Sequence, residues 1–217
     1  MPIDAASVPG TLARDAGRTA LLLIDLQNAF LHDQGTFGRF GFDVASMRRA
    51  VGPANELAGA ARRRGVPVIY IRYAYRADYG DIGIMGEIMP PAVATGALRN
   101  GEWDAELLDE VHVEANDQVV MKNRYSAFCG TGLAGHLRGR GITTLVLGGV
   151  LGNVCVTGTA ADAMQDDFRV FVAADACGSI DAASNAAAMA TVALAYGTVT
   201  DARTIAGAWL APVAERM

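Results

Sequence analysis

Short, uninterrupted apolar runs alternate with longer segments of helical periodicity along this chain of 217 residues. The runs are rich in Leu, Val and Ile, which is typical of parallel strands buried on both faces of a sheet. We predict six strands, at residues 19–25, 66–73, 118–122, 143–148, 169–174 and 197–200. Helical patterns fall between them, including those at residues 44–64, 103–111, 132–140 and 182–195. This alternation predicts an α/β fold: a three-layer Rossmann-like domain with a six-stranded parallel sheet flanked by helices.

The length of the chain fits a single α/β domain, which we place at residues 19–217. Residues 1–18 precede the first apolar run, and we expect them to form a loose N-terminal leader. They contain no basic region followed by an apolar one, so they do not have the pattern of a signal peptide. The longest irregular stretch, residues 74–101, follows the second strand. A connection of this length is typical of a functional loop, and we expect it to cover the site.

Charge and cysteine content narrow the range of partners. A net charge of −5 argues against a nucleic-acid binder, and no apolar run is long enough to span a membrane. The odd set of cysteines, Cys129, Cys155 and Cys177, favours a reduced, cytoplasmic location. Neither the cysteines nor the scattered histidines have the spacing of a metal site, so we predict no metal and no other cofactor. The alanine-rich helices favour a homo-oligomer, a dimer or a tetramer.

Three polar residues stand where predicted strands end: Asp25, Lys122 and Cys155. The carboxyl ends of parallel strands lie on one edge of a sheet, so we expect these side chains to converge. Cys155 then is a candidate nucleophile, Lys122 stabilises its thiolate, and Asp25 transfers protons. A helix start at Cys155 is expected to lower the pKa of its thiol. Each residue also has a simpler interpretation: Asp25 as a turn carboxylate, Lys122 as a surface charge and Cys155 as a small buried side chain. Gln27 and Asn28 likewise fit hydrogen bonding within a turn.

Three segments carry a resemblance that favours the catalytic interpretation: L-L-L-I-D-L-Q-N-A-F, M-K-N-R-Y-S-A-F and G-V-L-G-N-V-C-V-T-G-T-A-A-D-A. They resemble the signature blocks of the isochorismatase-like cysteine hydrolase superfamily, in the same order and at a similar spacing. The resemblance implies a parallel six-stranded sheet and a catalytic triad of Asp25, Lys122 and Cys155. It also implies a non-proline cis peptide between Val150 and Leu151, and an oxyanion hole formed by the amides of Leu151 and Cys155. Relatives commonly have Thr at the position of Gly152.

The branch of the superfamily is indicated by other residues. Isochorismatases proper usually replace the nucleophilic cysteine, whereas this chain keeps Cys155. Nicotinamidases have metal-binding histidines after the second strand, and residues 71–80 contain none. The segments at 41–44 and 101–104 resemble the ureidoacrylate amidohydrolase and N-carbamoyl amidase-like branch. We therefore predict a hydrolase that cleaves a linear amide, ureido or carbamoyl carbon–nitrogen bond of a small molecule through a thioester, releasing ammonia or an amine. The alternatives are a nicotinamidase- or isochorismatase-type hydrolase and a non-catalytic binding protein on the same fold.

Candidate substrate-binding residues lie near the ends of the second and third strands. Aromatic side chains there are expected to form the walls of a pocket, although core packing is an equally good interpretation. An arginine within the second strand is expected to bind a substrate carboxylate. The candidates are Phe30, Arg72, Tyr73, Tyr75, Tyr125 and Phe128.

Overall fold

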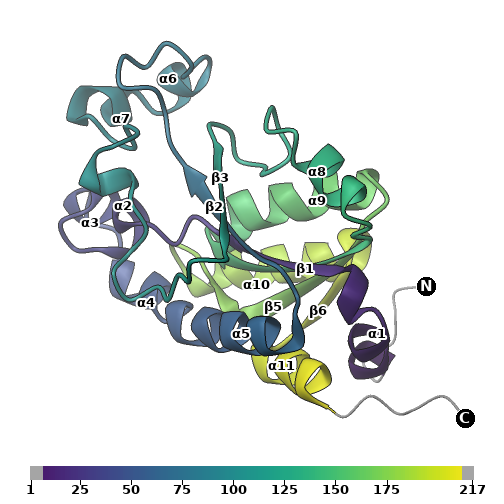
Figure 1. Ribbon diagram of the computed structural model, residues 1–217. Coiled ribbons are helices and arrows are strands. Elements are labelled where there is room, and N and C mark those ends of the chain that lie inside the picture. Colours follow the sequence, from purple (N-terminus) through teal and green to yellow (C-terminus); the bar gives the residue numbers. More distant parts are fainter. Residues whose placement is uncertain (1–6, 212–217) are drawn as a thin grey trace, which may run out of the picture.

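A computed structural model describes residues 7–211, and its centre is a six-stranded parallel sheet with the strand order β3-β2-β1-β4-β5-β6 (Figure 1). The strands are β1 (Thr19–Ile24), β2 (Val68–Tyr73), β3 (Gln118–Lys122), β4 (Thr144–Val150), β5 (Arg169–Gly178) and β6 (Thr198–Thr200). All six residues of β1 and all seven of β4 are buried, because these central strands are covered on both faces. The predicted fold class is confirmed.

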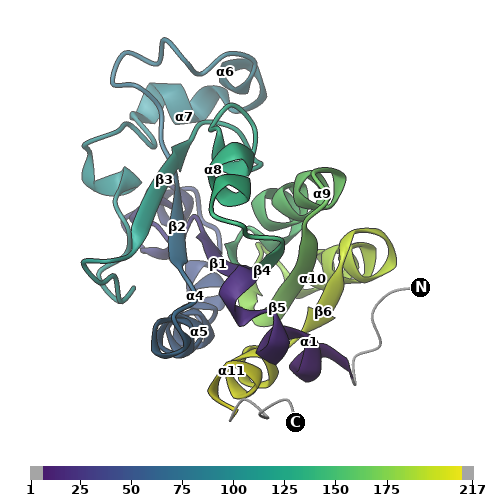
Figure 2. The same ribbon diagram turned by 45° about the vertical axis from the view of Figure 1, so that its right-hand side comes forward.

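Helices cover both faces of this sheet (Figures 1 and 2). One layer contains α5 (Val51–Arg64) and α11 (Ala202–Leu210), which pack against each other, and the opposite layer contains α8 (Leu133–Gly139) and α9 (Thr157–Gln165). The remaining helices are α1 (Val8–Arg14), α2 (Asn28–Leu31), α3 (Thr36–Arg39), α4 (Val44–Arg48), α6 (Met85–Ile88), α7 (Pro90–Thr95) and α10 (Ala182–Thr191). Single turns of other helix types are η2 (Ala16–Arg18), η3 (Trp103–Ala105), η4 (Gly152–Val156) and η5 (Val192–Tyr196).

Three local predictions need correction. The expected loose leader contains α1, which packs on α11 and buries Val8 and Leu12 completely; residues 1–6 lie outside the described part of the chain. The partner helix α11 is distant in sequence, so no local pattern indicates this packing. The single helix predicted at 44–64 is divided into α4 and α5, and the helix predicted at 103–111 is only the turn η3.

The strand order places a topological switch point between β1 and β4. The chain proceeds from β1 outward to β2 and β3, whereas from β4 it proceeds to β5 and β6 on the other side. Ligands in such sheets bind in the crevice at the carboxyl ends of the two diverging strands. Gly149 lets the two strands approach closely there, because its φ is +127° and a Cβ atom would overlap the backbone of Ile24.

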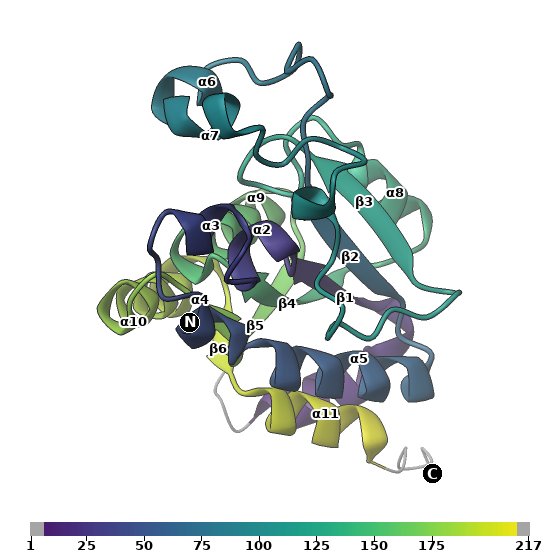
Figure 3. The same cartoon turned by 90° about the vertical axis from the view of Figure 1, so that its left-hand side faces the viewer.

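The long connection between β2 and β3 rises from this edge of the sheet. It carries α6 and α7, which project beyond the end of β2 (Figures 1 and 3). Tyr75 and Leu98 tie its two ends together, since the Tyr75 N–H donates to the Leu98 carbonyl at 2.8 Å. The segment therefore stands over the carboxyl edge, where the sequence predicted a covering loop.

Candidate active site

The side chains of Asp25, Lys122 and Cys155 meet at the carboxyl edge of the sheet. The Lys122 Nζ atom lies 2.7 Å from Asp25 Oδ2 and 3.5 Å from Cys155 Sγ. Asp25 and Lys122 have fully buried side chains, and Cys155 is 5% exposed. The structure thus brings together the three residues that the sequence placed at separate strand ends.

Asp25 is held by the first turn after β1. Its φ is +54°, a left-handed conformation that Asp tolerates better than most residues, and its N–H donates to the Ile71 carbonyl at 2.8 Å. One carboxylate oxygen, Oδ2, accepts from Lys122, whereas Oδ1 is buried without a hydrogen-bond partner among the described residues. A buried acceptor without a partner is costly to a fold and is a feature of functional sites. Oδ1 is therefore the atom available to exchange a proton with the thiol or a substrate.

Lys122 is the last residue of β3, which lies two strands away in the sheet from β1, the strand that precedes Asp25. Its side chain crosses over the Tyr73 ring, with Nζ 4.2 Å from the ring centroid, and Nζ also donates to the Arg124 carbonyl at 3.1 Å. The ring face favours a desolvated ammonium group, and the carbonyl fixes its position. These contacts keep the ammonium between Asp25 and Cys155.

Burial determines the protonation of the resting site. It raises the pKa of the Cys155 thiol far above its usual 9.0; Lys122 opposes this rise and the Asp25 carboxylate adds to it. Burial also raises the pKa of Asp25 above 3.8, against the effect of Lys122. Desolvation is the largest cause of the shift at Cys155, so the pKa of the resting thiol is raised, whereas the sequence predicted that a helix start would lower it. The resting site holds a neutral thiol beside the Lys122–Asp25 pair, and the thiol must lose its proton as it attacks.

The turn before Cys155 contains the cis peptide between Val150 and Leu151 that the resemblance implied. The Leu151 carbonyl faces the helix and accepts from the N–H groups of Val154 and Val156, each at 3.1 Å. The Leu151 N–H has no acceptor within residues 7–211, and Leu151 and Cys155 line the same cavity. An unpaired N–H beside the nucleophile is what an oxyanion hole requires. The assignment of the Leu151 and Cys155 amides to that role stays a prediction.

Gly152 follows the cis peptide, and its lack of a side chain has a specific reason. A Cβ atom there would overlap the Oδ1 atom of Asn185 and lie 3.1 Å from the Ser179 hydroxyl. Ser179 donates to Asn185 Oδ1 at 3.0 Å and accepts from the Asn153 N–H at 3.2 Å. Asn185 thus fills the space next to Gly152, and through Ser179 it supports the backbone two residues before Cys155.

This arrangement predicts the effect of the residue that relatives commonly have. Gly152→Thr is expected to lower the free energy of unfolding by about 1–3 kcal/mol, because the new side chain overpacks against Asn185. It is also expected to lower kcat/KM on the order of 10-fold to 10²-fold, since the turn that carries Cys155 shifts. Urea unfolding and steady-state kinetics measure both quantities.

The matched control is the double variant Gly152→Thr with Asn185→Ala, which removes the obstructing amide. It is expected to regain most of the lost stability, and the two substitutions should therefore be strongly non-additive in a double-mutant cycle. Additive losses would show that Asn185 is not what restricts the side chain at this position.

An apolar cavity of about 200 Å³ opens directly on Cys155. Thirteen residues line it, and they include four of the predicted substrate-binding residues, Phe30, Tyr73, Tyr75 and Tyr125. The sequence did not identify other walls of the cavity, which come from α3, the loop after α3, the β2–β3 connection and the segment after β5: Phe37, Phe42, Leu98 and Ile180. Only hydrophobicity marked these residues, and hydrophobicity by itself does not distinguish a pocket wall from the core.

The structure places Arg72 and Phe128 outside this cavity. Arg72 lies between two inward-facing residues of β2, so its side chain points to the opposite face. There its guanidinium group donates to the Ala105 carbonyl at 3.0 Å and to Glu106 at 2.6 Å. Phe128 packs on Phe168, with ring centroids 5.8 Å apart. Neither side chain is positioned to contact a substrate next to Cys155.

Two buried polar residues hold the loops that form the cavity. Gln27 donates to the main-chain oxygens of Tyr73 and Ala105 and accepts from the Tyr73 N–H, so it bonds to backbone as the sequence favoured. Asp104 accepts from the N–H and hydroxyl groups of Thr36 and from the Leu98 N–H. These bonds connect α3 and the β2–β3 connection, which both supply cavity walls. Asp104 belongs to a segment noted for its resemblance, but its role as an anchor was not predicted.

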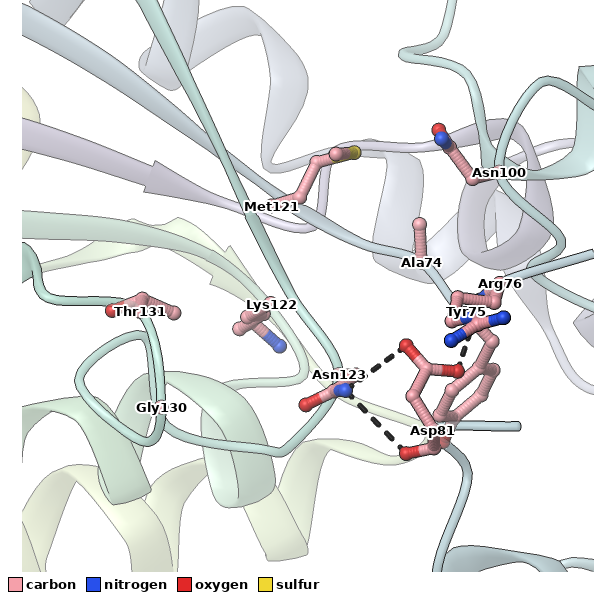
Figure 4. A pocket seen from close by; sticks show the side chains of 10 residues that line it. All are labelled: Ala74, Tyr75, Arg76, Asp81, Asn100, Met121, Lys122, Asn123, Gly130 and Thr131. Carbon is pink, nitrogen blue, oxygen red and sulfur yellow. Dashed lines mark hydrogen bonds between the residues drawn. The ribbon is translucent and has the colours of Figure 1, made fainter. Parts of the chain in front are cut away.

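A second cavity, of about 180 Å³, lies at the ends of β2 and β3 and contains neither Asp25 nor Cys155 in its walls (Figure 4). Figure 4 shows Asn123 directed toward Asp81, to which it donates at 3.1 Å. The Arg76 N–H donates to the other oxygen of Asp81 at 2.9 Å. The polar groups here bond to one another, and they fasten the β2–β3 connection to the end of β3.

The part of the chain that the structure describes, residues 7–211, has no group of three or more His, Cys, Asp or Glu side chains arranged to hold a metal ion. None of its helices is both long enough and apolar enough to cross a membrane.

Comparisons with known proteins agree with the geometry. A family model described as an isochorismatase domain matches residues 19–204. The ureidoacrylate amidohydrolase RutB of Methylobacterium radiotolerans is 33% identical over 206 residues, which cover 89% of this chain and 80% of that protein. A cysteine hydrolase from Pseudomonas syringae pv. phaseolicola has a similar structure, with a TM-score of 0.80 and 28% identity over 89% of this chain and 94% of the other. N-carbamoylsarcosine amidase from Thermoplasma acidophilum gives a TM-score of 0.69 and 32% identity over 85% and 96% of the two chains.

Proposed function

Because this chain belongs to the isochorismatase domain family, we propose that it hydrolyses a carbon–nitrogen bond of a small molecule with Cys155 as the nucleophile. The observation that carries the proposal is the convergence of Cys155, Lys122 and Asp25 at the switch point of the sheet, with Asp25 Oδ1 free to exchange a proton. The relatives support a hydrolase that acts on carbon–nitrogen bonds other than peptide bonds, since they include amidohydrolases and an amidase.

Acylation begins when Cys155 Sγ attacks the carbonyl carbon and its proton passes to Asp25. The electron pair of the carbonyl moves to oxygen, where the Leu151 and Cys155 amides are proposed to stabilise the negative charge. The tetrahedral intermediate then collapses, the carbon–nitrogen bond breaks, and Asp25 returns the proton to the leaving nitrogen. Ammonia or an amine departs, and the acyl group stays on sulfur as a thioester.

Deacylation reverses these roles with water as the nucleophile. Asp25 accepts a proton from water, the resulting hydroxide attacks the thioester, and the carbon–sulfur bond breaks. The proton returns to sulfur, which restores the neutral thiol favoured by burial. The Lys122 ammonium group stabilises the sulfur anion as it forms, from a distance of 3.5 Å in the resting site.

The alternatives receive less support from the residues present. A vinyl-ether cleavage of the isochorismatase type requires no acyl-enzyme, so the buried thiol beside Lys122 would have no catalytic role in it. A binding protein on this fold needs no unpaired carboxylate oxygen next to that thiol. A homo-oligomer, either dimer or tetramer, and a cytoplasmic location stay predictions from the sequence.

The thioester is the step to test. Acid quenching during turnover of an amide substrate, followed by peptide mass spectrometry, is expected to find the acyl group on the peptide that contains Cys155. Hydroxylamine added during turnover should intercept the thioester and form a hydroxamate. Cys129→Ala provides the control, because Cys129 is exposed and is not among the described residues that line the cavity at Cys155, and it should leave the adduct unchanged. Turnover without an adduct on Cys155 and without a hydroxamate would contradict the covalent mechanism.

A further inference from the structure

We infer that the substrate is a primary amide with an uncharged, apolar acyl group, and that the site disfavours anionic ureido and carbamoyl acids. This inference rests on the proposed amide hydrolysis and specifies the substrate of that same site. The cavity next to Cys155 carries the argument through its size, its lack of charge and its position relative to Asp25.

The size of the cavity sets the size of the acyl group. The volume of about 200 Å³ exceeds the roughly 150 Å³ of an apolar protein cavity that accommodates benzene. Its walls include an aromatic cluster in which Phe37 lies 5.0 Å from Phe30 and 4.8 Å from Phe42, measured between ring centroids. One aromatic ring, or a branched alkyl group of similar size, fills such a space and buries its surface against these rings.

The cavity offers no counterion for a carboxylate. All thirteen of its described lining residues are uncharged. Among the cations of neighbouring elements, Lys122 pairs with Asp25 and Arg72 pairs with Glu106. Arg124, which interacts electrostatically with the wall residue Tyr75, donates to the carbonyls of Asp81 and Asn123. A carboxylate in this cavity would lose its water without gaining a partner, which strongly disfavours binding.

Two of the three tyrosine hydroxyl groups in the walls are occupied, and the third, on Tyr125, has no hydrogen-bond partner within residues 7–211. The Tyr73 and Tyr75 hydroxyls lie 2.6 Å apart and bond to each other, and Tyr73 also donates to the Asn123 carbonyl at 3.2 Å. A ureido group has several donors and an acceptor, and most of these would remain unpaired against such walls. The tyrosine pair therefore presents mainly ring surface to the substrate.

The location of Asp25 decides which end of the amide enters the cavity. Asp25 must protonate the leaving nitrogen, and it is fully buried and absent from the described walls of the cavity. The nitrogen consequently lies on the enclosed side and the acyl group on the cavity side. An enclosed position favours a small leaving group, so the nitrogen leaves as ammonia. The carboxylate that deacylation produces is an anion without a counterion in the cavity, and this promotes its release.

The test compares two amides of nearly equal shape that differ in charge. 4-Methylpentanamide ends in an isopropyl group, and succinamate has a carboxylate in the same place. Ammonia release by the wild-type enzyme is expected to give a kcat/KM on the order of 10² or more times higher for the neutral amide. Benzamide should likewise be preferred over ureidoacrylate and N-carbamoylsarcosine.

A charge placed at the mouth of the cavity tests the cause of this preference. Ile180 is 39% exposed and lines the cavity, so a lysine there can place its ammonium group at the solvated mouth, within reach of a carboxylate on a bound substrate. Ile180→Lys is expected to shift the ratio of kcat/KM values toward succinamate by about 10-fold or more. Ile180→Met, of similar length and without charge, is the matched control and should leave the ratio near that of the wild type.

The outcomes separate this inference from the proposed function. Hydrolysis that favours succinamate, ureidoacrylate or N-carbamoylsarcosine would overturn the inference and leave amide hydrolysis intact. If no amide is hydrolysed, the proposed function fails, and ligand-observed NMR with the Cys155→Ala variant still tests the cavity. That variant should bind 4-methylpentanamide or benzamide more tightly than succinamate, and equal or reversed affinities would overturn the inference.

Discussion

Replacement of Cys155 by alanine is expected to lower kcat/KM on the order of 10⁴-fold to 10⁶-fold, the largest effect of any single substitution in this chain. The variant lacks the atom that forms the covalent intermediate, and Asp25 and Lys122 cannot replace it. The change removes one small buried atom, so we expect a modest loss of about 1–2 kcal/mol in the free energy of unfolding. Ammonia release measures the first quantity, and urea unfolding measures the second.

The two other cysteines provide controls for this result. Cys129 is exposed, and Cys177 is buried at the end of β5, where no described contact connects it to Asp25 or Lys122. Cys129→Ala should keep nearly full activity, and Cys177→Ala should retain its kcat even if it unfolds more easily. A Cys155→Ala enzyme with more than about a hundredth of wild-type activity would mean that another group begins the reaction.

Lys122→Met is expected to abolish turnover and also to destabilise the protein by about 3–5 kcal/mol. The substitution leaves the Asp25 carboxylate fully buried and without the partner that lies 2.7 Å away in the wild type. Methionine keeps the apolar stem that crosses the Tyr73 ring, so the lost stability reports on the charge. Chemical denaturation at pH 7 measures the loss.

The loss of stability should depend on pH with a definite sign. Burial raises the pKa of Asp25 above 3.8 in the folded protein, and Lys122 opposes this rise, so removing the lysine raises the pKa further. At pH values between the pKa of Asp25 in the unfolded chain and its higher pKa in the folded variant, the folded variant binds more protons than the unfolded chain. Its free energy of unfolding therefore increases as pH falls through the folded pKa of Asp25, and this gain is complete below the unfolded value. Denaturation curves at several pH values measure this slope.

The double variant Asp25→Asn with Lys122→Met separates stability from catalysis. It removes both charges, and asparagine tolerates the left-handed backbone at position 25. It should recover much of the stability lost in Lys122→Met, lose the pH dependence of that loss, and stay inactive. Lys122→Met with wild-type stability at pH 7 would show that the Lys122–Asp25 pair is not buried as described.

Local sequence patterns were sufficient to predict the strands of the sheet and the residues that meet at their ends. The six strands were predictable because each is a short apolar run, and the residue at the end of a run is easily read. Asp25, Lys122 and Cys155 were expected to converge because parallel strands share one carboxyl edge, and the structure brings them together. The cis peptide between Val150 and Leu151 came from the resemblance of a whole segment, since no single residue indicates it.

The direction of each side chain within a strand was harder to predict from the sequence. Arg72 and Tyr73 are neighbours in β2, and both were candidates for substrate contact. Successive side chains point to opposite faces, so only one of them can reach the cavity, and the register of β2 in the sheet decided that it is Tyr73. Arg72 pairs with Glu106 instead, a partner that no local pattern identifies.

The sequence by itself determined the fold class, the three chemical groups and the edge of the sheet at which they meet, because these follow from periodicity and from the geometry common to parallel sheets. Only the tertiary structure decided the protonation of Cys155, the need for glycine at position 152 and the apolar character of the cavity. Burial, the position of Asn185 and walls such as Phe37, Leu98 and Ile180 depend on segments that are distant along the chain. In the proposed function, the turn before Cys155 therefore specifies the kind of reaction, while packing among distant segments selects the amide.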